Sequence, residues 1–267
     1  IKDHPESRFI PHAYLSFGEY YFGTGEMQAA LQFYQRVTEF PPERNSIYGY
    51  ALYKTAWTQY NLQDFRGSLE SFAAVIDFAR QHPEAADAQN LVRQARRELV
   101  MPYSRIGTPE RALDVFMRYA ENRDGALDML ESLAELYFDT GQWDKTIATY
   151  HRLMAEAPQS DKLCGWEGKI TNAVLNQGNK NNTVQELARL TRVYETFVGE
   201  THPDTAKNEC KAATAAVLFT LATQWHVEAV GTEDHPGTND RATMTQAADL
   251  YQMLLAQFPD MENLEYP

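Results

Sequence analysis

The chain has 267 residues, 43% of them hydrophobic and 23% charged, which is enough apolar material for a sizeable core and excludes a disordered chain. No apolar run approaches the roughly 18 residues of a membrane span, so direct membrane insertion is not expected. The net charge of −13 argues against a general nucleic-acid binder, because such proteins present a basic surface.

The first predicted element is a pair of short helices over about residues 11–45. Apolar and small residues, Gly18 among them, recur at steps of three and four, as they do on one face of a helix. Gly25 marks the turn between the two helices. Pro41 and Pro42 end the second helix, because proline cannot continue a helix and moves the preceding residue away from helical geometry.

A second pair is predicted over about 46–82. Ala56 takes the place that Gly18 has in the first pair, where two helices can approach closely. Gln63 stands where a turn glycine is expected, so Asn61 or Asp64 is predicted to adopt the turn geometry instead.

The third pair, over about 83–124, is less regular. Its first helix is predicted to run from Pro83 to about Tyr103, with a kink or early stop at Pro102. Thr108 is the expected N-cap of its second helix.

The fourth pair, over about 126–160, repeats the pattern of the first two. Gly141 supplies the left-handed backbone geometry of its turn, and Ala134 is the small residue of its first helix. Neither helix can bury its apolar face alone. Each must therefore pack on its partner and on a neighbouring pair.

A fifth pair, over about 161–200, turns at Gly178, and Asn182 or Thr183 is the expected cap of its second helix. A sixth pair, over about 203–260, begins with a long helix to Ala229, continues through a polar loop and ends with a shorter helix.

These pairs resemble the tetratricopeptide repeat, a helix–turn–helix unit of about 34 residues. In the fourth pair the residues that match the family pattern are Leu130, Leu133, Ala134, Tyr137, Gly141, Tyr150 and Pro158. Thr146 and Leu153 replace two alanines of that pattern. The resemblance implies an all-α fold, an α-solenoid in which about six antiparallel helix pairs stack into a right-handed superhelix over residues 1–267. Residues 3–10 and the last residues look like joints between repeats, so we interpret the chain as a window of a longer array.

The two cysteines, Cys164 and Cys210, do not form a closely spaced metal or redox motif. Both lie in predicted helices and are interpreted as small core residues. A disulfide between them requires an oxidising compartment, and the sequence leaves their pairing open.

The sequence contains no HExxH, GxSxG, P-loop or GxGxxG motif and no pair of histidines at the spacing of a helical zinc site. We therefore expect no catalytic residues, no metal and no cofactor. The resemblance implies instead a concave groove, lined by the first helix of each pair, that holds a segment of a partner protein.

The candidate groove residues come from several pairs. Tyr53, Trp57 and Tyr60 of the second pair are placed inward, where polar residues are common, and large aromatic residues are frequent binding hot spots. The alternative is that they pack under a neighbouring repeat. Glu135 of the fourth pair and Asn172 of the fifth are also placed inward, and Asn172 would bond a ligand backbone.

The stretch from residue 89 to 123 holds seven arginines, no lysine and four acidic residues, in a chain that is otherwise acidic. Arg97 and Arg105 of this stretch are placed inward and would clamp a carboxylate of an acidic partner segment. The alternative for these arginines is pairing with Glu131 or Glu135 on a solvated face.

The predicted function is a non-catalytic protein–protein interaction scaffold. One alternative is the substrate-recruiting or regulatory region of an enzyme whose catalytic domain lies outside this chain. Another is a self-assembling array, in which the chain forms homo-oligomers. Joints such as the one at residues 4–9 are similar in style to envelope tetratricopeptide proteins of Gram-negative bacteria, some of which support motility machinery. That similarity favours the periplasm or cell envelope over the cytoplasm.

Overall fold

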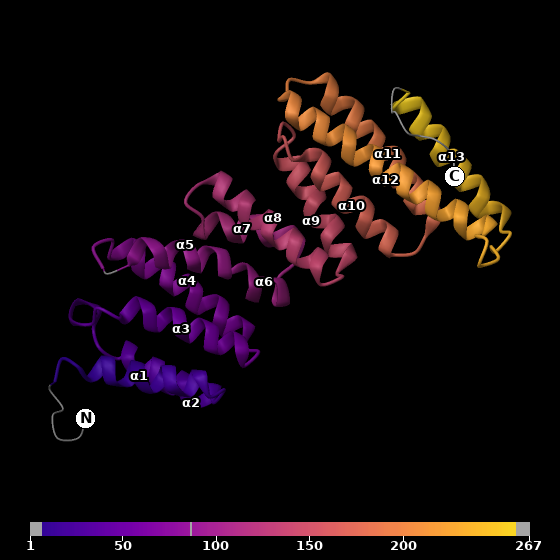
Figure 1. Cartoon of the computed structure of the whole chain (residues 1–267). Helices are drawn as coiled ribbons and strands as arrows, with labels where there is room; N and C mark the ends of the chain where they lie inside the picture. The colour runs from indigo at the N-terminus through magenta and orange to yellow at the C-terminus, as the bar shows by residue number, and fades with distance from the viewer. Residues whose placement is uncertain (1–6, 86, 260–267) are drawn as a thin grey trace. The chain divides into compact units, whose positions relative to one another are not determined.

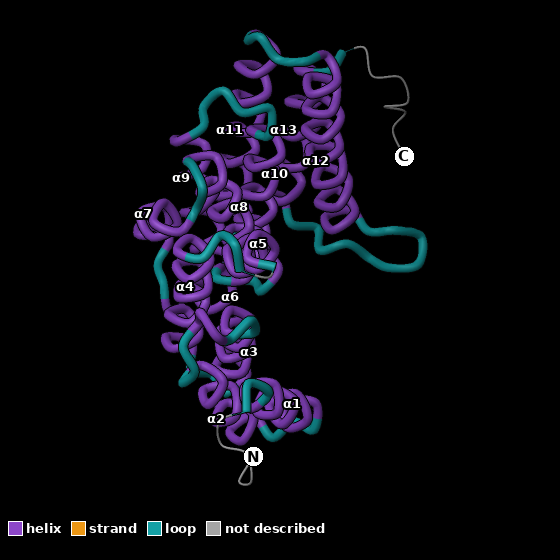
Figure 2. The backbone as a smooth tube through the Cα atoms, turned by 90° about the vertical axis from the view of Figure 1, so that its left-hand side faces the viewer, coloured by secondary structure: helices purple, strands orange, loops and turns teal. Residues whose placement is uncertain are grey.

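The computed structural model describes residues 7–85 and 87–259, and its regular elements there are helices, apart from one isolated bridge between Gly231 and Pro236 (Figure 1). This confirms the all-α prediction. The joints expected before residue 7 and after residue 259 lie outside the described residues. Figure 2 shows the same helices in purple joined by loops in teal.

The helices fall into two compact units, residues 1–137 and 138–267, and each is described by itself. The first unit contains α1 (Ile10–Gly23), α2 (Met27–Thr38), the short 3-10 helix η1 (Pro42–Arg44), α3 (Tyr48–Asn61), α4 (Phe65–Gln81), α5 (Ala88–Glu98), α6 (Val100–Ile106), α7 (Pro109–Tyr119) and most of α8 (Arg123–Asp139). α1 packs on α2, α2 on α3, α3 on α4 and α4 on α5. Helix pairs that stack in this way form the predicted α-solenoid architecture.

The small residues lie where the sequence places them. A Cβ atom added to Gly18 would lie 2.6 Å from Cε1 of Tyr34, so the backbone of α1 meets a ring of α2 at this point. Ala56 and Ala134 are fully buried. Glycine is required at position 18 because any side chain there would overlap the tyrosine ring.

The third pair corrects the sequence prediction. Its first helix does not run unbroken from Pro83, because α5 begins at Ala88 and ends at Glu98, and α6 follows after Leu99. The break comes before Pro102, which is the third residue of α6, a position where the missing N–H leaves no helical bond unmade. Thr108 precedes α7 as predicted, but its side chain forms no capping bond.

Two turn predictions are also corrected. Gln63 itself adopts the left-handed conformation, with φ +63°, because Asp64 accepts a hydrogen bond from Gly67 N at 3.0 Å as the N-cap of α4. In the fifth pair Asn179 is the N-cap of α11, and neither Asn182 nor Thr183 has that role. Gly141 has the predicted positive φ, and the turn glycines Gly25 and Gly178 have a positive φ as well.

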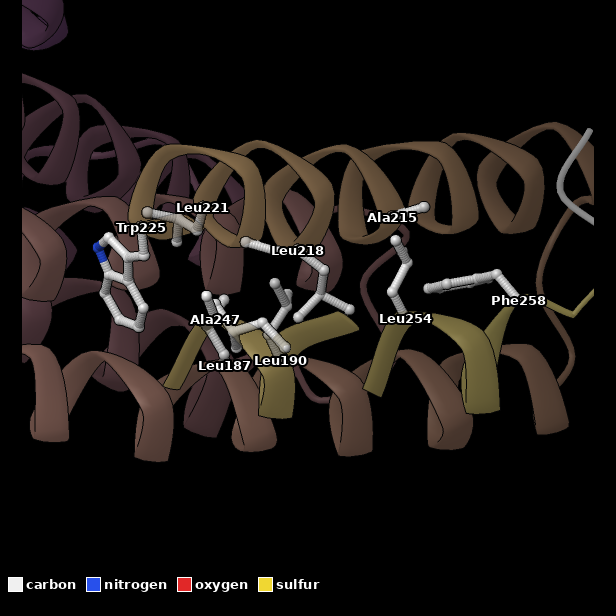
Figure 3. Close-up of a cluster of buried hydrophobic side chains, with 11 residues drawn as sticks. Leu187, Leu190, Ala215, Leu218, Leu221, Trp225, Ala247, Leu254 and Phe258 are labelled. Carbon is white, nitrogen blue, oxygen red and sulfur yellow. The ribbon is translucent and has the colours of Figure 1, made fainter. Parts of the chain in front are cut away.

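The second unit contains α9 (Trp143–Glu156), α10 (Leu163–Asn176), α11 (Lys180–Gly199), α12 (Asp204–Val230) and α13 (Arg241–Gln257). Its main core lies between the last three helices (Figure 3). The buried residues there are Leu187 and Leu190 from α11, Leu218, Leu221 and Trp225 from α12, and Ala247, Leu250 and Leu254 from α13. The long α12 is thus held along its length by two other helices.

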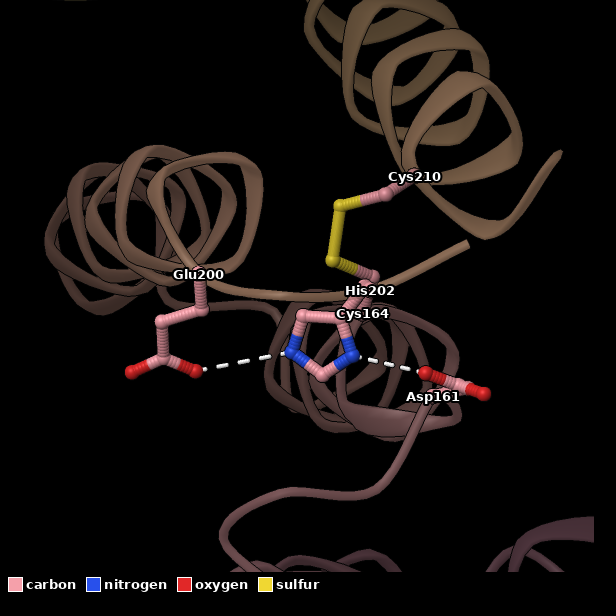
Figure 4. Close-up of a disulfide and its surroundings, with 5 residues drawn as sticks. All are labelled: Asp161, Cys164, Glu200, His202 and Cys210. Carbon is pink, nitrogen blue, oxygen red and sulfur yellow. Dashed lines mark hydrogen bonds and ion pairs between the residues drawn. A yellow bond between two sulfur atoms is a disulfide. The ribbon is translucent and has the colours of Figure 1, made fainter. Parts of the chain in front are cut away.

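The cysteines are buried, as predicted, but they are not unpaired core residues. Cys164 in the first turn of α10 and Cys210 in α12 form a disulfide, with their Cα atoms 5.5 Å apart (Figure 4). Both belong to a buried core cluster with Phe197, as interpreted, and the pairing that the sequence left open is a disulfide. They are 46 positions apart in the sequence, so no local pattern could reveal the contact.

Candidate functional site

The predicted aromatic residues form a continuous ladder on α3. Tyr53, Trp57 and Tyr60 are four and three residues apart, so they lie on one side of the helix, and all three are half-buried. Phe72 of α4 lies behind them, with its ring centroid 5.9 Å from those of both Tyr53 and Trp57. The ladder therefore rests on the partner helix and keeps part of each ring exposed.

The ladder continues to the arginine at its far end. The Trp57 and Tyr60 rings meet edge to face at 5.8 Å, and Tyr60 meets Phe65 of α4 at 5.4 Å. The guanidinium carbon of Arg105, in α6, lies 5.9 Å from the centroid of the Phe65 ring. Arg105 is exposed, so a cation borders the rings at this end.

At the other end the ladder reaches Arg97 through a buried acid that the sequence analysis did not single out. The Tyr53 hydroxyl donates a 2.8 Å hydrogen bond to Oε2 of Glu98, and Arg97 donates to Oε1 at 3.1 Å. The Arg97 side chain is nevertheless 75% exposed. Burial raises the pKa of Tyr53, so its hydroxyl remains a donor at neutral pH. We call the set Tyr53, Trp57, Tyr60, Arg97 and Arg105 the aromatic face.

The edge of the aromatic face toward α1 has its own polar network. Lys54 of α3 lies 3.2 Å from Oε2 of Glu19 and 4.0 Å from the centroid of the Phe22 ring. Tyr34 donates to the other oxygen of Glu19 at 2.9 Å. Because these groups satisfy one another, they orient α1 against α3 and offer little free charge to a partner.

Part of the basic stretch has a structural role. Arg96 donates to the carbonyl oxygen of Tyr119 at 2.9 Å, and Arg80 donates to the carbonyl oxygens of Tyr119 and Ala120. These carbonyls end α7, where a cation compensates the unpaired acceptors and the helix dipole. Arg97 and Arg105 are the arginines of this stretch that belong to the aromatic face.

The other two predicted groove residues, Glu135 and Asn172, lie outside the aromatic face. Glu135 is exposed on α8. Asn172 belongs to the second unit, where its side-chain amide donates to the Gly168 carbonyl of its own helix at 2.9 Å. Both stay predictions that the structure does not link to the aromatic face.

The structure gives no sign of a metal centre in the residues it describes, since no three His, Cys, Asp or Glu side chains there are grouped to hold an ion. None of the helices within 7–85 and 87–259 has both the length and the hydropathy of a membrane span.

Comparison with known proteins identifies the repeat. The tetratricopeptide repeat family model matches residues 50–82 and 128–160, which fall within the second and fourth predicted pairs. The chain therefore contains tetratricopeptide repeats at these two stretches, as its sequence pattern indicated. Repeats of this kind stack into extended concave surfaces that bind other proteins.

No curated protein matches the chain. Among solved structures, the chain is similar to a Rap protein crystallised with Competence and Sporulation Factor, at 13% sequence identity, with 93% of this chain and 75% of that one covered. The TM-score of 0.36 is too low for this likeness to carry an argument about fold or function.

Proposed function

We propose that the chain is a non-catalytic interaction scaffold and that the aromatic face binds a segment of a partner protein. The observation that carries the proposal is the half-buried ladder of Tyr53, Trp57 and Tyr60, bordered at both ends by an exposed arginine. Tryptophan, tyrosine and arginine are the residues most enriched at binding hot spots.

The packing of the ladder supports a role in tight contact. Trp57 is already fixed between Tyr60 and Phe72 in the absence of a partner. A ring that is held in place loses little conformational freedom on binding, so more of its contact energy appears as affinity.

The charge pattern favours a partner segment that combines apolar and acidic side chains. Arg105 forms a cation–π contact and remains exposed, and Arg97 shares a carboxylate with Tyr53 while most of its side chain remains exposed. Such partly exposed cations attract an acidic segment before contact and orient it over the rings.

The test begins with capture of partners on the immobilised protein, followed by affinity measurement with the purified partner. Trp57→Ala is expected to weaken binding by about 2 kcal/mol, roughly 30-fold in Kd, chiefly through faster dissociation. Tyr20→Ala is the matched control, because Tyr20 is a 63% exposed aromatic residue of α1 outside the aromatic face.

Charge reversal separates the role of the arginines from that of the rings. Arg97→Glu and Arg105→Glu are expected to slow association and to reduce its dependence on salt, with a smaller effect on dissociation. Partner affinities equal to wild type in Trp57→Ala and in both arginine variants, all with intact circular dichroism, would show that the aromatic face is not the site.

We further propose that the protein works in an oxidising compartment, of which the bacterial periplasm or cell envelope is one example. The Cys164–Cys210 disulfide supports this, because such bonds form and persist outside the reducing cytosol. Alkylation of the protein in intact cells should leave both cysteines unmodified until a reductant is added. Rapid alkylation without reductant would contradict the proposal.

A further inference from the structure

The second unit has a pocket of about 320 Å³ where the end of α9, the first turn of α10 and the second half of α11 meet. Its apolar lining comes from Met154, Leu163, Val193 and Phe197, and Arg189 and Arg192 also line it. This volume lies near the lower end of the range of ligand pockets, roughly 300–1,000 Å³, which suits one or two side chains better than a large cofactor.

Phe197 forms the floor of the pocket, and its side chain is fixed by contacts on the side away from the pocket. Phe197 is fully buried although it lines the pocket, and its ring stacks on the His202 imidazole with centroids 3.8 Å apart. Nδ1 of His202 lies 2.6 Å from Asp161 Oδ1, and Nε2 lies 3.4 Å from Glu200 Oε2 (Figure 4). The imidazole therefore cannot turn without breaking both contacts.

The disulfide also helps to fix the lining of the pocket. Cys164 and Cys210 pack with Phe197 in one buried cluster, and Leu163 of the pocket lining precedes Cys164 in the chain. The bond ties the first turn of α10 to α12. Because its lining is fixed in this way, the pocket exists before any ligand arrives, which lowers the cost of binding.

The charge of the pocket is positive at one side. Arg189 is partly engaged, since its Nε lies 3.3 Å from Oε1 of the buried Glu167. Arg192, one turn further along α11, is exposed and forms no ion pair within the described part of the chain. The carboxylate among the lining residues, Glu200, faces His202. The pocket thus offers an apolar cavity beside a cation.

We propose that this pocket is a second docking site, separate from the aromatic face, for a partner segment in which an aliphatic side chain lies next to a carboxylate. The aliphatic group fills the space between Met154, Val193 and Phe197, and the carboxylate binds Arg192. The choice of occupant rests on charge complementarity. An apolar group alone would leave the Arg192 guanidinium without a carboxylate to bind, and an acidic group alone would leave the apolar walls of the pocket in water.

The test uses N-acetyl-leucine as the probe and N-acetyl-leucinamide, its neutral counterpart, as the matched ligand. The protein carries ¹³C-methyl methionine, so that Met154 reports on the pocket, and Met27, which does not line it, serves as a reference. N-acetyl-leucine should shift the Met154 signal saturably with a Kd in the low millimolar range, about what a ligand of this size can reach. The amide should bind about tenfold more weakly.

Variants assign the binding to the pocket. Arg192→Gln should weaken N-acetyl-leucine about tenfold, whereas Arg241→Gln, at an exposed arginine of α13 that does not line the pocket, should leave its affinity unchanged. Thr196→Trp, at an exposed lining residue, should fill the pocket and abolish the Met154 shift. Cys164→Ser with Cys210→Ser should weaken binding of both probes by loosening the floor.

Equal shifts with the acid and the amide would overturn the proposal, as would full affinity in Arg192→Gln. Because Arg192 is exposed and no hydrogen bond or ion pair of its side chain is found in the described part of the chain, this variant remains informative even if Thr196→Trp fails to fold. The absence of any saturable Met154 shift in the oxidised wild-type protein would equally show that the pocket is not a docking site.

Discussion

The two units of the chain differ in how they hold a buried carboxyl group. In the first unit the buried Glu98 has a hydrogen bond to each oxygen, and the buried Asn45 donates to the Val37 carbonyl at 2.8 Å. In the second unit Glu167 is fully buried, yet neither of its oxygens accepts a hydrogen bond. Its charged neighbours are the Arg189 guanidinium, at 3.3 Å, the Glu186 carboxyl and the Arg192 guanidinium.

The connections differ as well. In the first unit, α1 to α4 pack through small residues at the family spacing, and each helix contacts its neighbours in the chain. In the second unit, a disulfide and the contacts of His202 tie the start of α10 to segments around residues 200–210. The comparison teaches that helices at the regular repeat spacing are held by packing and polar contacts alone, whereas the departure from that spacing in the second unit coincides with a covalent bond.

The sharpest way to break this comparison is to remove the disulfide. Cys164→Ser with Cys210→Ser should destabilise the second unit by about 4 kcal/mol, because the bond closes a loop of 46 residues and restricts the unfolded chain. Hydrogen exchange should show faster opening of α10 to α12 and unchanged protection of α1 to α4. Equal loss of protection in α1 to α4 would show that the two units do not differ in this way.

The buried carboxyl predicts a dependence of stability on pH that is specific to the second unit. Burial, with the neighbouring Glu186 carboxyl, raises the pKa of Glu167 to about 8 from its usual 4.5. The folded state therefore binds a proton that the unfolded state releases between these values, and stability falls as the pH rises from about 4.5 to 8. The loss should be on the order of 3 kcal/mol, and Glu167→Gln should remove most of it.

Urea unfolding of the second unit at several pH values measures this effect. Glu135→Gln is the control, because Glu135 is exposed and its replacement should leave the pH profile unchanged. A Glu167→Gln profile with the same slope as wild type would mean that another group titrates.

Sequence patterns revealed the parts of the fold that depend on residues close together in the chain. The helix pairs, the turns at Gly25, Gly141 and Gly178, and the close approach at Gly18 all follow from steps of three and four residues. The interruption predicted at Pro102 falls three residues earlier, at Leu99, because the proline occupies the first turn of the next helix.

Contacts between distant residues were not predictable in the same way. The aromatic ladder was visible as a pattern on one helix, but the bond from Tyr53 to Glu98 joins residues 45 apart. The disulfide and the pocket around Phe197 likewise depend on how α9 to α12 pack. A local pattern carries no information on contacts between residues far apart in the sequence. The sequence therefore indicated the aromatic residues and arginines of the aromatic face but not the buried Glu98 that bonds to Tyr53.

A substitution in the first unit tests whether small residues hold its helices. Gly18→Leu should destabilise this unit by about 2 kcal/mol, because the new side chain overlaps the Tyr34 ring. Gly23→Leu is a suitable control, since a Cβ at position 23 meets no atom within 4 Å. Equal thermal stability of the two variants would show that the contact between α1 and α2 adjusts freely, and the contrast between the units would weaken.

The smallest expected effect compares the two stretches that match the family model. Gln63 and Gly141 occupy the same position in them, and both adopt a positive φ, +63° and +69°. A left-handed backbone costs a residue with a side chain roughly 1–2 kcal/mol, whereas glycine adopts it freely but loses more entropy on folding.

Gln63→Gly should therefore stabilise the first unit by about 0.5 kcal/mol, and the reciprocal Gly141→Gln should destabilise its own turn by about 1 kcal/mol. Denaturant midpoints of the two variants, measured against wild type, should move in opposite directions. If Gln63→Gly lowers the midpoint, the exposed glutamine side chain makes a contribution that offsets its backbone strain, and the turn of the second pair is not a weakened copy of the turn in the fourth.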